Sequence, residues 1–298
     1  MIPTIFPSSL DICDNYDALL LDAYGVFWNG NAAGLIPGAK QAMEKLKNKN
    51  KVIGILSNAT QPSEKEITKL QKHGLIQGIH YDFLLTSGEV AKNIFLNNQL
   101  PFQTPNNKFY LFGGIHPHYP SPLILFENSQ YQHTENLKEA DFIYISIPHI
   151  NGENQTDPFV FEEKIQKIKE HNLPMVCANP DEFAHEGKPP VAVVRQGSIA
   201  KIYNNIGGEV FYIGKPYSPA YIEAMKFFNK HSIYDLKKIL MIGDTPATDI
   251  EGANRFGLDS ALITKHGNMK DQITKNGRNK AILSLKDVLK PSYFIEEL

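Results

Sequence analysis

The chain has 298 residues, enough for about two domains of ordinary size. Its composition, with 42% hydrophobic and 21% charged residues, is typical of a folded globular protein and excludes a disordered or collagen-like chain. Thirty basic residues against 32 acidic ones leave a formal net charge of −2, which gives no electrostatic basis for binding nucleic acid or an anionic membrane surface.

The N-terminal segment MIPTIFPSSLDICDNYD lacks the basic and apolar regions of a signal peptide. No apolar run approaches the ~20 residues that a membrane-spanning helix needs. Two cysteines, Cys13 and Cys177, are too few for a disulfide framework or a four-cysteine zinc site, and we expect both to be small buried side chains. Together these features predict a soluble, cytoplasmic protein in a reducing compartment.

The first third of the chain alternates short apolar runs with amphipathic stretches. We expect strands within 17–27, 52–60 and 82–88, and helices within 38–50, 62–74 and 89–98. The last third repeats the pattern, with expected strands at 209–216, at the end of 233–245 and at 260–267, and expected helices at 198–208, 218–231 and 247–257. Strands and helices that alternate at this spacing predict βαβ units and a parallel sheet.

The middle of the chain, about residues 89–197, is different because loop signals such as GGIHPHYPSP and IPHINGENQTDP interrupt it. Strand-like pieces remain at 108–114, 140–147 and 174–180, with one helix at 158–172. We therefore predict an α/β protein with a Rossmannoid parallel-sheet core, helices on both faces of that sheet, and an inserted α/β domain. The predicted core comprises residues 1–87 and 198–298, and the insertion comprises 88–197.

Polar side chains follow several of the predicted strands of the core. In open parallel sheets, ligands bind outside the carboxyl ends of the strands. The residues at these ends, or just beyond them, are Asp22, Ser57, Asn58, Lys215, Asp244 and Asp249. Carboxylates held close together repel one another unless a cation lies between them, and such an oxygen-rich site suits Mg²⁺. A lysine and a hydroxyl on the same edge add donors for a phosphate, and an aspartate can serve as the nucleophile of phosphoryl transfer.

Each of these residues also has a purely structural interpretation. Asp22 could be a strand-end residue, and Asp249 could cap the helix that follows it. Ser57 could be a turn residue whose hydroxyl bonds the local backbone, and Lys215 an exposed loop lysine. Because these residues all follow predicted strands, they favour a shared site over separate local roles.

Four segments in order, LLLDAYGVFWNG, LSNAT, GKP and IGDTPATDIEGA, resemble the four motifs of the haloacid dehalogenase (HAD) superfamily. The insertion of about 110 residues between the second and third motifs resembles the cap of the class IIA members, the NagD-like phosphatases of sugar and nucleotide phosphates. The segment ANPDE at 178–182 is similar to a cap segment of that group. The resemblance spans nearly the whole chain, and the apolar strand followed by GDxxxxD is its most specific part.

The resemblance implies a role for each site residue. Asp22 would be the nucleophile, Ser57 with Asn58 would hold the transferring phosphoryl group, and Lys215 would neutralise charge on both. Asp244 would bind Mg²⁺ together with Asp22 and the backbone carbonyl of Tyr24, and Asp249 would lie in or near the outer coordination sphere. The cap candidates for substrate contact are Asn179, Pro180 and Asp181. The implied substrate is a small phosphorylated metabolite, and a homodimer formed through the cap is a further expectation.

Tyr24 departs from the family pattern, because phosphatases of this superfamily usually carry Asp at this position as the general acid and base. A backbone carbonyl is present whatever the side chain, so the expected Mg²⁺ site is unaffected. Proton transfer is affected, since general acid–base help is typically worth ~10²–10⁴-fold in rate. A phenol with a pKa of ~10 can protonate a leaving alkoxide but is a poor base for activating water. Tyr24 could instead be only a packing aromatic.

Three functions therefore stay open: a phosphatase, a binding or regulatory protein that kept the phosphate and Mg²⁺ site but lost turnover, and a phosphonate-type hydrolase or phosphotransferase. The intact set of Asp22, Lys215, Asp244 and Asp249 favours the first. His116 and His118 form a His-x-His pair without an acidic or cysteine companion nearby, which is more typical of a loop than of a metal site. GEVFYIGKP does not have the spacing of a phosphate-binding loop, and no G-x-G-x-x-G follows the first strand.

Overall fold

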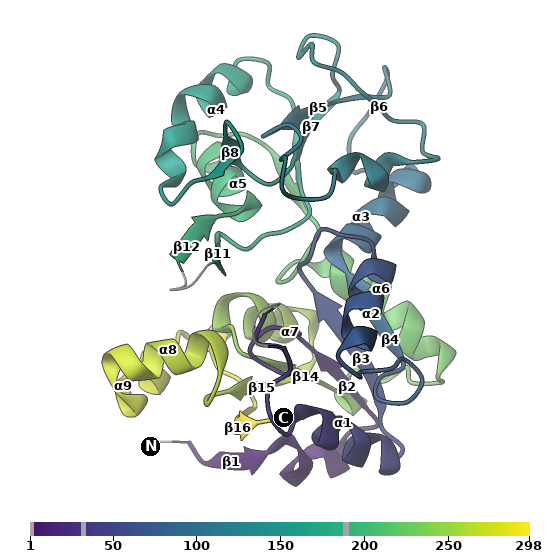
Figure 1. Cartoon of the computed structure of the whole chain (residues 1–298), viewed down its shortest axis with the longest axis vertical. Coiled ribbons are helices and arrows are strands. Elements are labelled where there is room, and N and C mark those ends of the chain that lie inside the picture. The colour runs from purple at the N-terminus through teal and green to yellow at the C-terminus, as the bar shows by residue number, and fades with distance from the viewer. Residues whose placement is uncertain (1–2, 31–33, 187–190) are drawn as a thin grey trace. The chain divides into compact units, whose positions relative to one another are not determined.

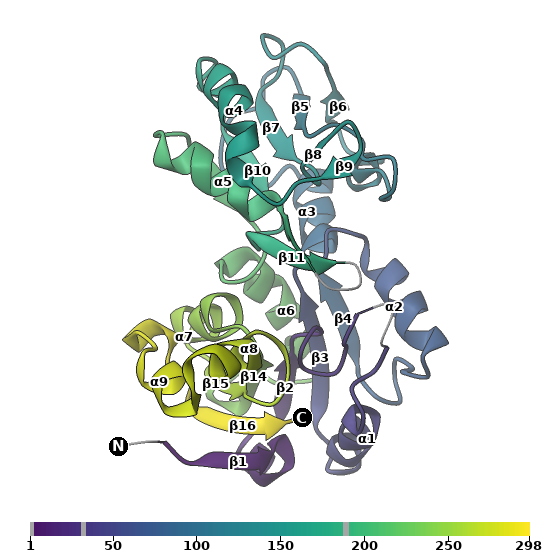
Figure 2. The same ribbon diagram turned by 60° about the vertical axis from the view of Figure 1, so that its left-hand side comes forward.

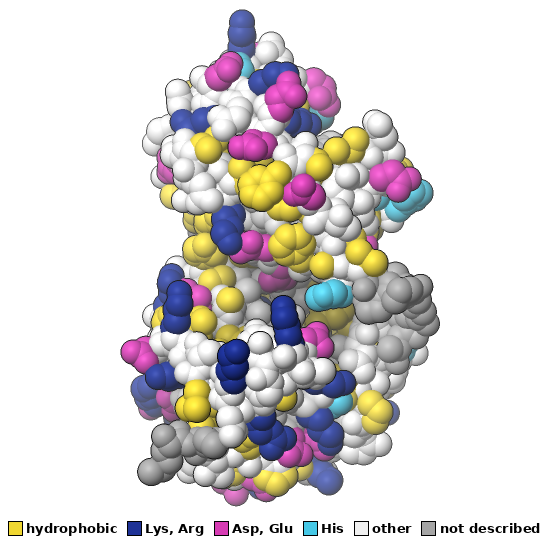
Figure 3. All heavy atoms as spheres, turned by 90° about the vertical axis from the view of Figure 1, so that its left-hand side faces the viewer, with side chains coloured by type: hydrophobic (Ala, Val, Ile, Leu, Met, Phe, Trp, Pro, Cys, Tyr) yellow, Lys and Arg dark blue, Asp and Glu magenta, His cyan; other side chains and the backbone are white. Residues whose placement is uncertain are grey.

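The computed structural model of the protein describes residues 3–30, 34–186 and 191–298. The chain divides into two compact units (Figure 1): the first comprises residues 1–57, 63–85 and 215–298, and the second comprises 58–62 and 86–214. On the face drawn in Figure 3, Lys and Arg side chains of each unit are interspersed with Asp and Glu. Among the described residues, no helix is long and apolar enough to cross a membrane.

The first unit is built on a seven-stranded sheet. Its strand order is β1(Ile5–Ser8), β16(Tyr293–Glu297), β15(Asp259–Ile263), β14(Ile239–Gly243), β2(Ala18–Leu21), β3(Val52–Ser57), β4(Phe83–Thr86). The pairs from β1 through to β3 are parallel. β2 and β14 are buried along their whole length, as expected of central strands covered on both faces.

Helices cover both faces of this sheet. They are α1(Ala39–Asn48), α2(Ser63–Lys72), α6(Ser218–Lys230), α7(Glu251–Phe256), α8(Gly267–Asn276) and α9(Arg278–Leu283). Neighbouring residues of one strand pack into different apolar clusters: Ala261 and Ile263 share a cluster with Met43 of α1, whereas Leu262 shares one with Met269 of α8. Because side chains alternate along a strand, this division shows that both faces are covered. The predicted α/β class with a parallel-sheet core is confirmed.

The strands predicted around the motifs are present, each shorter than its apolar run. β1 and β16 were not predicted, although they form one edge of the sheet, where they lie side by side (Figure 2). The helix expected at 247–257 begins as a π-helical turn, Pro246–Ile250, and continues as α7.

The second unit contains a five-stranded sheet with the order β13(Val210–Tyr212), β10(Met175–Cys177), β7(Phe142–Ile145), β5(Lys108–Phe112), β6(Gln132–His133), and all its pairs are parallel. Its helices are α3(Ser87–Leu96), α4(Glu162–Lys169) and α5(Gln196–Asn205). Two short antiparallel strand pairs complete it, β8(His149–Ile150) with β9(Glu153–Asn154), and β11(Phe183–Glu186) with β12(Val191–Val194). Cys177 of this unit and Cys13 of the first unit are both free and buried, as expected.

The predicted boundary after residue 197 is wrong. α5 and β13, which we assigned to the core from their strand–helix pattern, belong to the second unit, because Val210, Phe211 and Tyr212 pair with β10. The second unit therefore extends to residue 214, and it also includes the short segment 58–62. A helix followed by a strand has the same local pattern in either domain, and only the strand pairing distinguishes them.

Candidate active site

Two of the predicted site aspartates emerge from neighbouring central strands. Asp22 directly follows β2 and Asp244 directly follows β14, and the two strands are parallel with Leu21 opposite Ile242. This register places both carboxylates at the same edge of the sheet. Asp249, in the π-helical turn after β14, joins them, and carboxylate oxygens of the three residues lie within 4.8 Å of one another.

Lys215 completes this cluster. Its Nζ atom lies 2.5 Å from Oδ1 of Asp22 and 2.8 Å from Oδ1 of Asp249, and its side chain is only 2% exposed. We expected Lys215 at the end of a core strand. It instead follows β13 of the second unit's sheet and precedes α6, so a connecting segment positions it.

The charges in this cluster do not balance. Burial raises the pKa of Asp244 well above its usual range, and the carboxylates of Asp249 and Asp22 raise it further. Burial also raises the pKa of Asp22, although Lys215 opposes the rise. Burial disfavours the charge on Lys215, but Asp22 and Asp249 outweigh it and raise the pKa of the ammonium group. Three carboxylates facing one ammonium group leave an excess of negative charge that a bound cation would neutralise.

Asp249 uses its carboxylate mainly to fix the loop. Its Oδ2 atom accepts hydrogen bonds from the backbone N–H groups of Asp244 and Thr245, both at 3.1 Å, while Oδ1 faces Lys215. These contacts engage both oxygens, so Asp249 orients Asp244 and Lys215. Asp22 differs from it because its side chain is 13% exposed against 1% for Asp249, which leaves Asp22 the more accessible carboxylate.

Two glycines enclose the Asp244 carboxylate. Gly25 has a φ of +73°, and a Cβ atom built on it would lie 2.5 Å from Oδ2 of Asp244. Gly267 has a φ of +63°, and its Cβ would overlap the same carboxylate. Both positions therefore need glycine for backbone conformation and for space. The Tyr24 carbonyl belongs to the peptide bond that precedes Gly25, so the backbone of this turn, and not the Tyr24 side chain, determines where the carbonyl lies.

The Tyr24 side chain is 46% exposed and is associated with α2. Nζ of Lys69 lies 5.7 Å from the centre of the Tyr24 ring and 5.3 Å from that of Trp28. Partial desolvation raises the pKa of the Tyr24 hydroxyl, and the Lys69 ammonium group opposes that rise. Lys69 also pairs with Glu66, whose carboxylate raises the pKa of the phenol, so the Tyr24 ring lies beside an ion pair of α2.

The remaining predicted residues lie at the end of β3 and in the second unit. Ser57 is the last residue of β3 and is buried. In the second unit, Nδ2 of Asn58 donates to Oδ1 of Asp181 at 3.0 Å, and the backbone N–H of Asp181 donates to Oδ1 of Asn179 at 2.9 Å. A Cβ atom built on Gly214 would lie 2.7 Å from Pro180, so this loop is closely packed against the chain just before Lys215.

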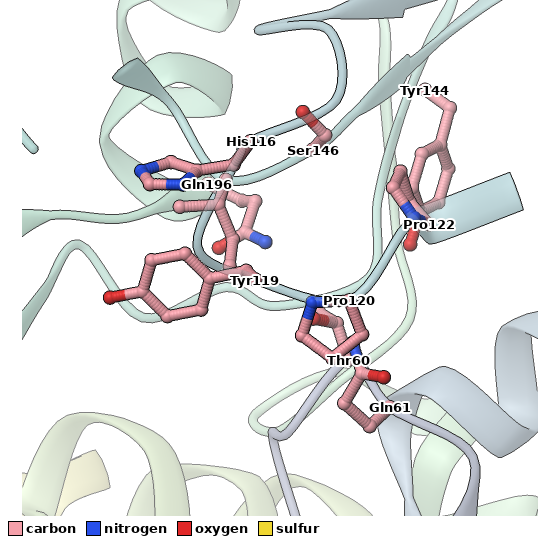
Figure 4. A pocket seen from close by; sticks show the side chains of 10 residues that line it. Thr60, Gln61, His116, Tyr119, Pro120, Pro122, Tyr144, Ser146 and Gln196 are labelled. Atoms are coloured by element: carbon pink, nitrogen blue, oxygen red, sulfur yellow. The ribbon is translucent and has the colours of Figure 1, made fainter. Parts of the chain in front are cut away.

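The second unit also contains a small cavity of about 10 Å³ (Figure 4). Its walls include His116, Tyr119, Tyr144 and Gln196, with Thr60 from the short segment 58–62. The Tyr144 hydroxyl is buried and forms no hydrogen bond within the described structure. The volume suits a single water molecule, so this cavity is too small for a metabolite.

Sequence reasoning missed Thr245, Asn268 and the two glycines around Asp244. The Thr245 hydroxyl lies 2.9 Å from Oδ1 of Asp244, and the Asn268 backbone N–H donates to Oδ2 at 2.6 Å. Asn268 is 24 residues away from Asp244. No local pattern predicts such a contact, because Gly267 was expected only as the end of a strand at 260–267 and α8 was not predicted.

Two family models match the sequence. One, described as haloacid dehalogenase-like hydrolase, matches residues 19–117, which include Asp22 and Ser57. The other, described as HAD-hydrolase-like, matches residues 212–289, which include Lys215, Asp244 and Asp249. The chain belongs to the haloacid dehalogenase-like hydrolases. No curated protein is similar enough in sequence to match it.

Solved structures with the same fold cover nearly the whole chain. A haloacid dehalogenase-like hydrolase from Brucella suis 1330 is 24% identical with a TM-score of 0.78, over 98% of this chain and 99% of that chain. A possible sugar phosphatase of the HAD superfamily from Cytophaga hutchinsonii is 21% identical with a TM-score of 0.74, over 99% and 98%. A glycerol phosphate phosphatase from Mycobacterium tuberculosis in complex with magnesium is 19% identical with a TM-score of 0.66, over 95% and 75%. At these identities the likeness concerns the fold.

Proposed function

We propose that the protein is a Mg²⁺-dependent phosphatase that hydrolyses a small phosphorylated metabolite through an aspartyl-phosphate on Asp22. The observation that carries this proposal is the cluster of Asp22, Asp244, Asp249 and Lys215 at the carboxyl ends of β2 and β14. Membership of the hydrolase family supports it. So does the similarity in fold to a possible sugar phosphatase and to a glycerol phosphate phosphatase.

The cluster has the donor set that Mg²⁺ prefers. The cation binds oxygen ligands, usually one or two carboxylates with waters and phosphate oxygens. Asp22, Asp244 and the Tyr24 carbonyl would bind the cation directly. Asp249 would lie in or near the outer coordination sphere and would orient Lys215 and the loop backbone. When bound, the metal ion would neutralise negative charge on the carboxylates and on the phosphoryl oxygens.

In the first chemical step, a carboxylate oxygen of Asp22 attacks the phosphorus atom. The bond between phosphorus and the ester oxygen breaks, and the leaving alkoxide departs with the electron pair and takes up a proton from solvent. In the second step, a water oxygen attacks the same phosphorus, and the bond to Asp22 breaks. This restores the carboxylate and releases inorganic phosphate, and the water proton passes to solvent. Lys215 stabilises the charge on Asp22 and on the phosphoryl group, and the Ser57 hydroxyl donates to a phosphoryl oxygen.

The second unit would act as a cap that excludes water and selects the leaving group. Asn179, Pro180 and Asp181 are its proposed substrate-contacting loop, held to Asn58 by the hydrogen bond with Asp181. A sugar phosphate, nucleotide or similar small metabolite is the proposed substrate class. We also propose that a homodimer could form through this unit, as in class IIA relatives.

A screen of about 100 phosphorylated metabolites, with Mg²⁺ and with EDTA, tests this proposal. We expect phosphate release from at least one compound, dependent on Mg²⁺, and its loss in Asp22→Asn, which is nearly isosteric. Asp287→Asn is the matched control, because the Asp287 side chain is 97% exposed and forms an ion pair with the exposed side chain of Lys290. Activity of Asp22→Asn at the wild-type rate, with deamidation excluded by mass spectrometry, would disprove the assignment.

A second function is favoured by one observation, the phenol at position 24. We propose as the alternative that the chain binds Mg²⁺ and a phosphorylated ligand with little turnover, or that it runs phosphonate hydrolysis or phosphotransfer on the same scaffold. Calorimetric binding of a phosphorylated metabolite that is not hydrolysed over hours would support the binding function. Phosphate release from that same metabolite would exclude it.

A further inference from the structure

Asp244 is held by the beginning of α8. The backbone N–H of Asn268 donates to Oδ2 of Asp244 at 2.6 Å, and the backbone N–H of Met269 donates to the carbonyl of Asp244 at 3.1 Å. Asp244 thus occupies two of the N–H groups that the first turn of any helix leaves without partners. The positive end of the helix dipole also favours a negative carboxylate at this point.

The side chain of Asn268 adds a second connection. Its Nδ2 lies 2.6 Å from Oγ1 of Thr245, and this Oγ1 lies 2.9 Å from Oδ1 of Asp244. Asp244 binds a cation in its ionised form, and an ionised carboxylate can only accept, so in that form the Thr245 hydroxyl must donate to Asp244. The hydroxyl oxygen is then free to accept, which requires the Asn268 amide to present its NH₂ group. The direction of donation therefore runs from Asn268 through Thr245 to Asp244.

Each oxygen of the Asp244 carboxylate consequently has one donor from the protein. Oδ1 accepts from Thr245 and Oδ2 accepts from the Asn268 backbone, while Gly25 and Gly267 enclose the group. A carboxylate oxygen has two lone pairs, so each oxygen keeps one for a cation. The carboxylate cannot rotate without breaking one of these contacts.

We infer that Asn268 and Thr245 are positioning residues that orient Asp244 for Mg²⁺, an inference that rests on the proposed function. Hydrogen-bonding partners of metal ligands typically change metal affinity 10–100-fold when they are removed. Thr245 touches the ligand directly, whereas the Asn268 amide acts through Thr245. The effect of Thr245 should accordingly be the larger, and the effect of Asn268 should depend on the Thr245 hydroxyl.

Isothermal titration with MgCl₂, in the absence of any substrate, tests the inference on the intact protein. We expect Thr245→Val to weaken Mg²⁺ binding at least tenfold, Asn268→Ala to weaken it at least threefold, and Thr245→Ser to restore it. The double variant should bind like Thr245→Val alone, because Asn268 has nothing to act on once the hydroxyl is gone. Gln272→Ala, an exposed position one turn further along α8, is the control and should bind like the wild type.

The outcomes separate this inference from the proposed function. Asn268 is exposed, so its truncation should leave the melting temperature of the metal-free protein within about 2 °C of the wild type, and loss of Mg²⁺ affinity would then not reflect unfolding. Wild-type Mg²⁺ affinity in Asn268→Ala, or additive effects in the double variant, would overturn the inference while leaving the phosphatase intact. A raised KM with unchanged Mg²⁺ affinity would also overturn it, because Asn268 would then contact substrate. A wild-type protein that binds no Mg²⁺ would overturn both.

Discussion

Replacing Lys215 with methionine would remove the ammonium group that pairs with Asp22 and Asp249 of the aspartate cluster. Methionine keeps most of the apolar length, so the main loss is the ammonium group between Asp22 and Asp249. Removing one partner of a buried ion pair costs about 3–5 kcal/mol, because the remaining charge stays buried without compensation. At about 2–4 °C per kcal/mol for a domain of this size, the melting temperature should fall by roughly 6–20 °C in EDTA.

Mg²⁺ should reverse much of this loss. Without Lys215, the three carboxylates attract a cation more strongly, and a ligand that binds only the folded state stabilises it in proportion to the logarithm of its concentration over Kd. The rise in melting temperature on adding MgCl₂ should therefore be larger for Lys215→Met than for the wild type, although phosphatase activity should be lost. Lys237→Met is the control: Lys237 pairs with Asp259 at 3.2 Å but its side chain is 67% exposed, so the cost should stay below about 1 kcal/mol.

Differential scanning calorimetry in EDTA and in MgCl₂ measures both quantities. A melting temperature of Lys215→Met within 2 °C of the wild type in EDTA would refute the electrostatic argument. So would an equal response of the two proteins to MgCl₂, because the cluster would then not be short of positive charge.

Three further predictions concern single positions. Tyr24→Asp should raise turnover at least ~10-fold if proton transfer limits the reaction, with Mg²⁺ affinity unchanged because the carbonyl remains; no gain with any substrate in a folded, metal-binding variant would contradict this. Gly267→Ala should cost about 1–2 kcal/mol for its left-handed backbone and should also displace Asp244, weakening Mg²⁺ binding in calorimetry at least ~10-fold. Gly277→Ala, with a φ of +79° and no neighbour within 4 Å of its Cβ, should bind Mg²⁺ normally, and equal affinities in the two variants would count against the argument. Burial lowers the pKa of His116 and of His149, so the unfolded chain binds more protons than the folded one, and stability should be lost as pH falls below about 6.5. Urea midpoints at about pH 7.5 and 5.5 should therefore differ less in His116→Asn/His149→Asn than in the wild type, and an equal difference would exclude these histidines as the cause.

The central strands could be predicted because burial on both faces leaves an unbroken apolar run. The apolar segments DALLL and KILMI predict the strands that the structure has as β2 and β14. The aspartates that follow these strands lie close together at one edge of the sheet. β1 and β16 could not be predicted in this way. Their residues are mostly half-buried, and β16, YFIEE, mixes apolar and acidic residues. The two strands are recognisable only from their pairing with each other across the length of the chain.

The groups that orient the site aspartates were harder to predict from the sequence than the aspartates themselves. Asp22, Asp244 and Asp249 occur in motifs, whereas the groups that orient them come from distant segments. Asn268 lies at the beginning of α8, the helix after the next strand, and Lys215 lies on the segment that connects β13 to α6. The hydrogen bond between Asn58 and Asp181 likewise joins residues that are 123 positions apart. Such contacts depend on how the elements pack, and a period or a spacing in the sequence does not encode them.

Position 24 shows why metal binding and turnover should be treated as separate properties of this chain. Its carbonyl is placed by the Gly25 turn, which any residue at 24 would share. Its side chain lies beneath the ammonium group of Lys69, which belongs to α2. The tyrosine can therefore change proton transfer, worth roughly 3–5 kcal/mol of barrier, without disturbing the cation site. A protein that binds Mg²⁺ tightly but hydrolyses the aspartyl-phosphate slowly would fit this division, because a phenol can protonate a leaving alkoxide but is a poor base for activating water.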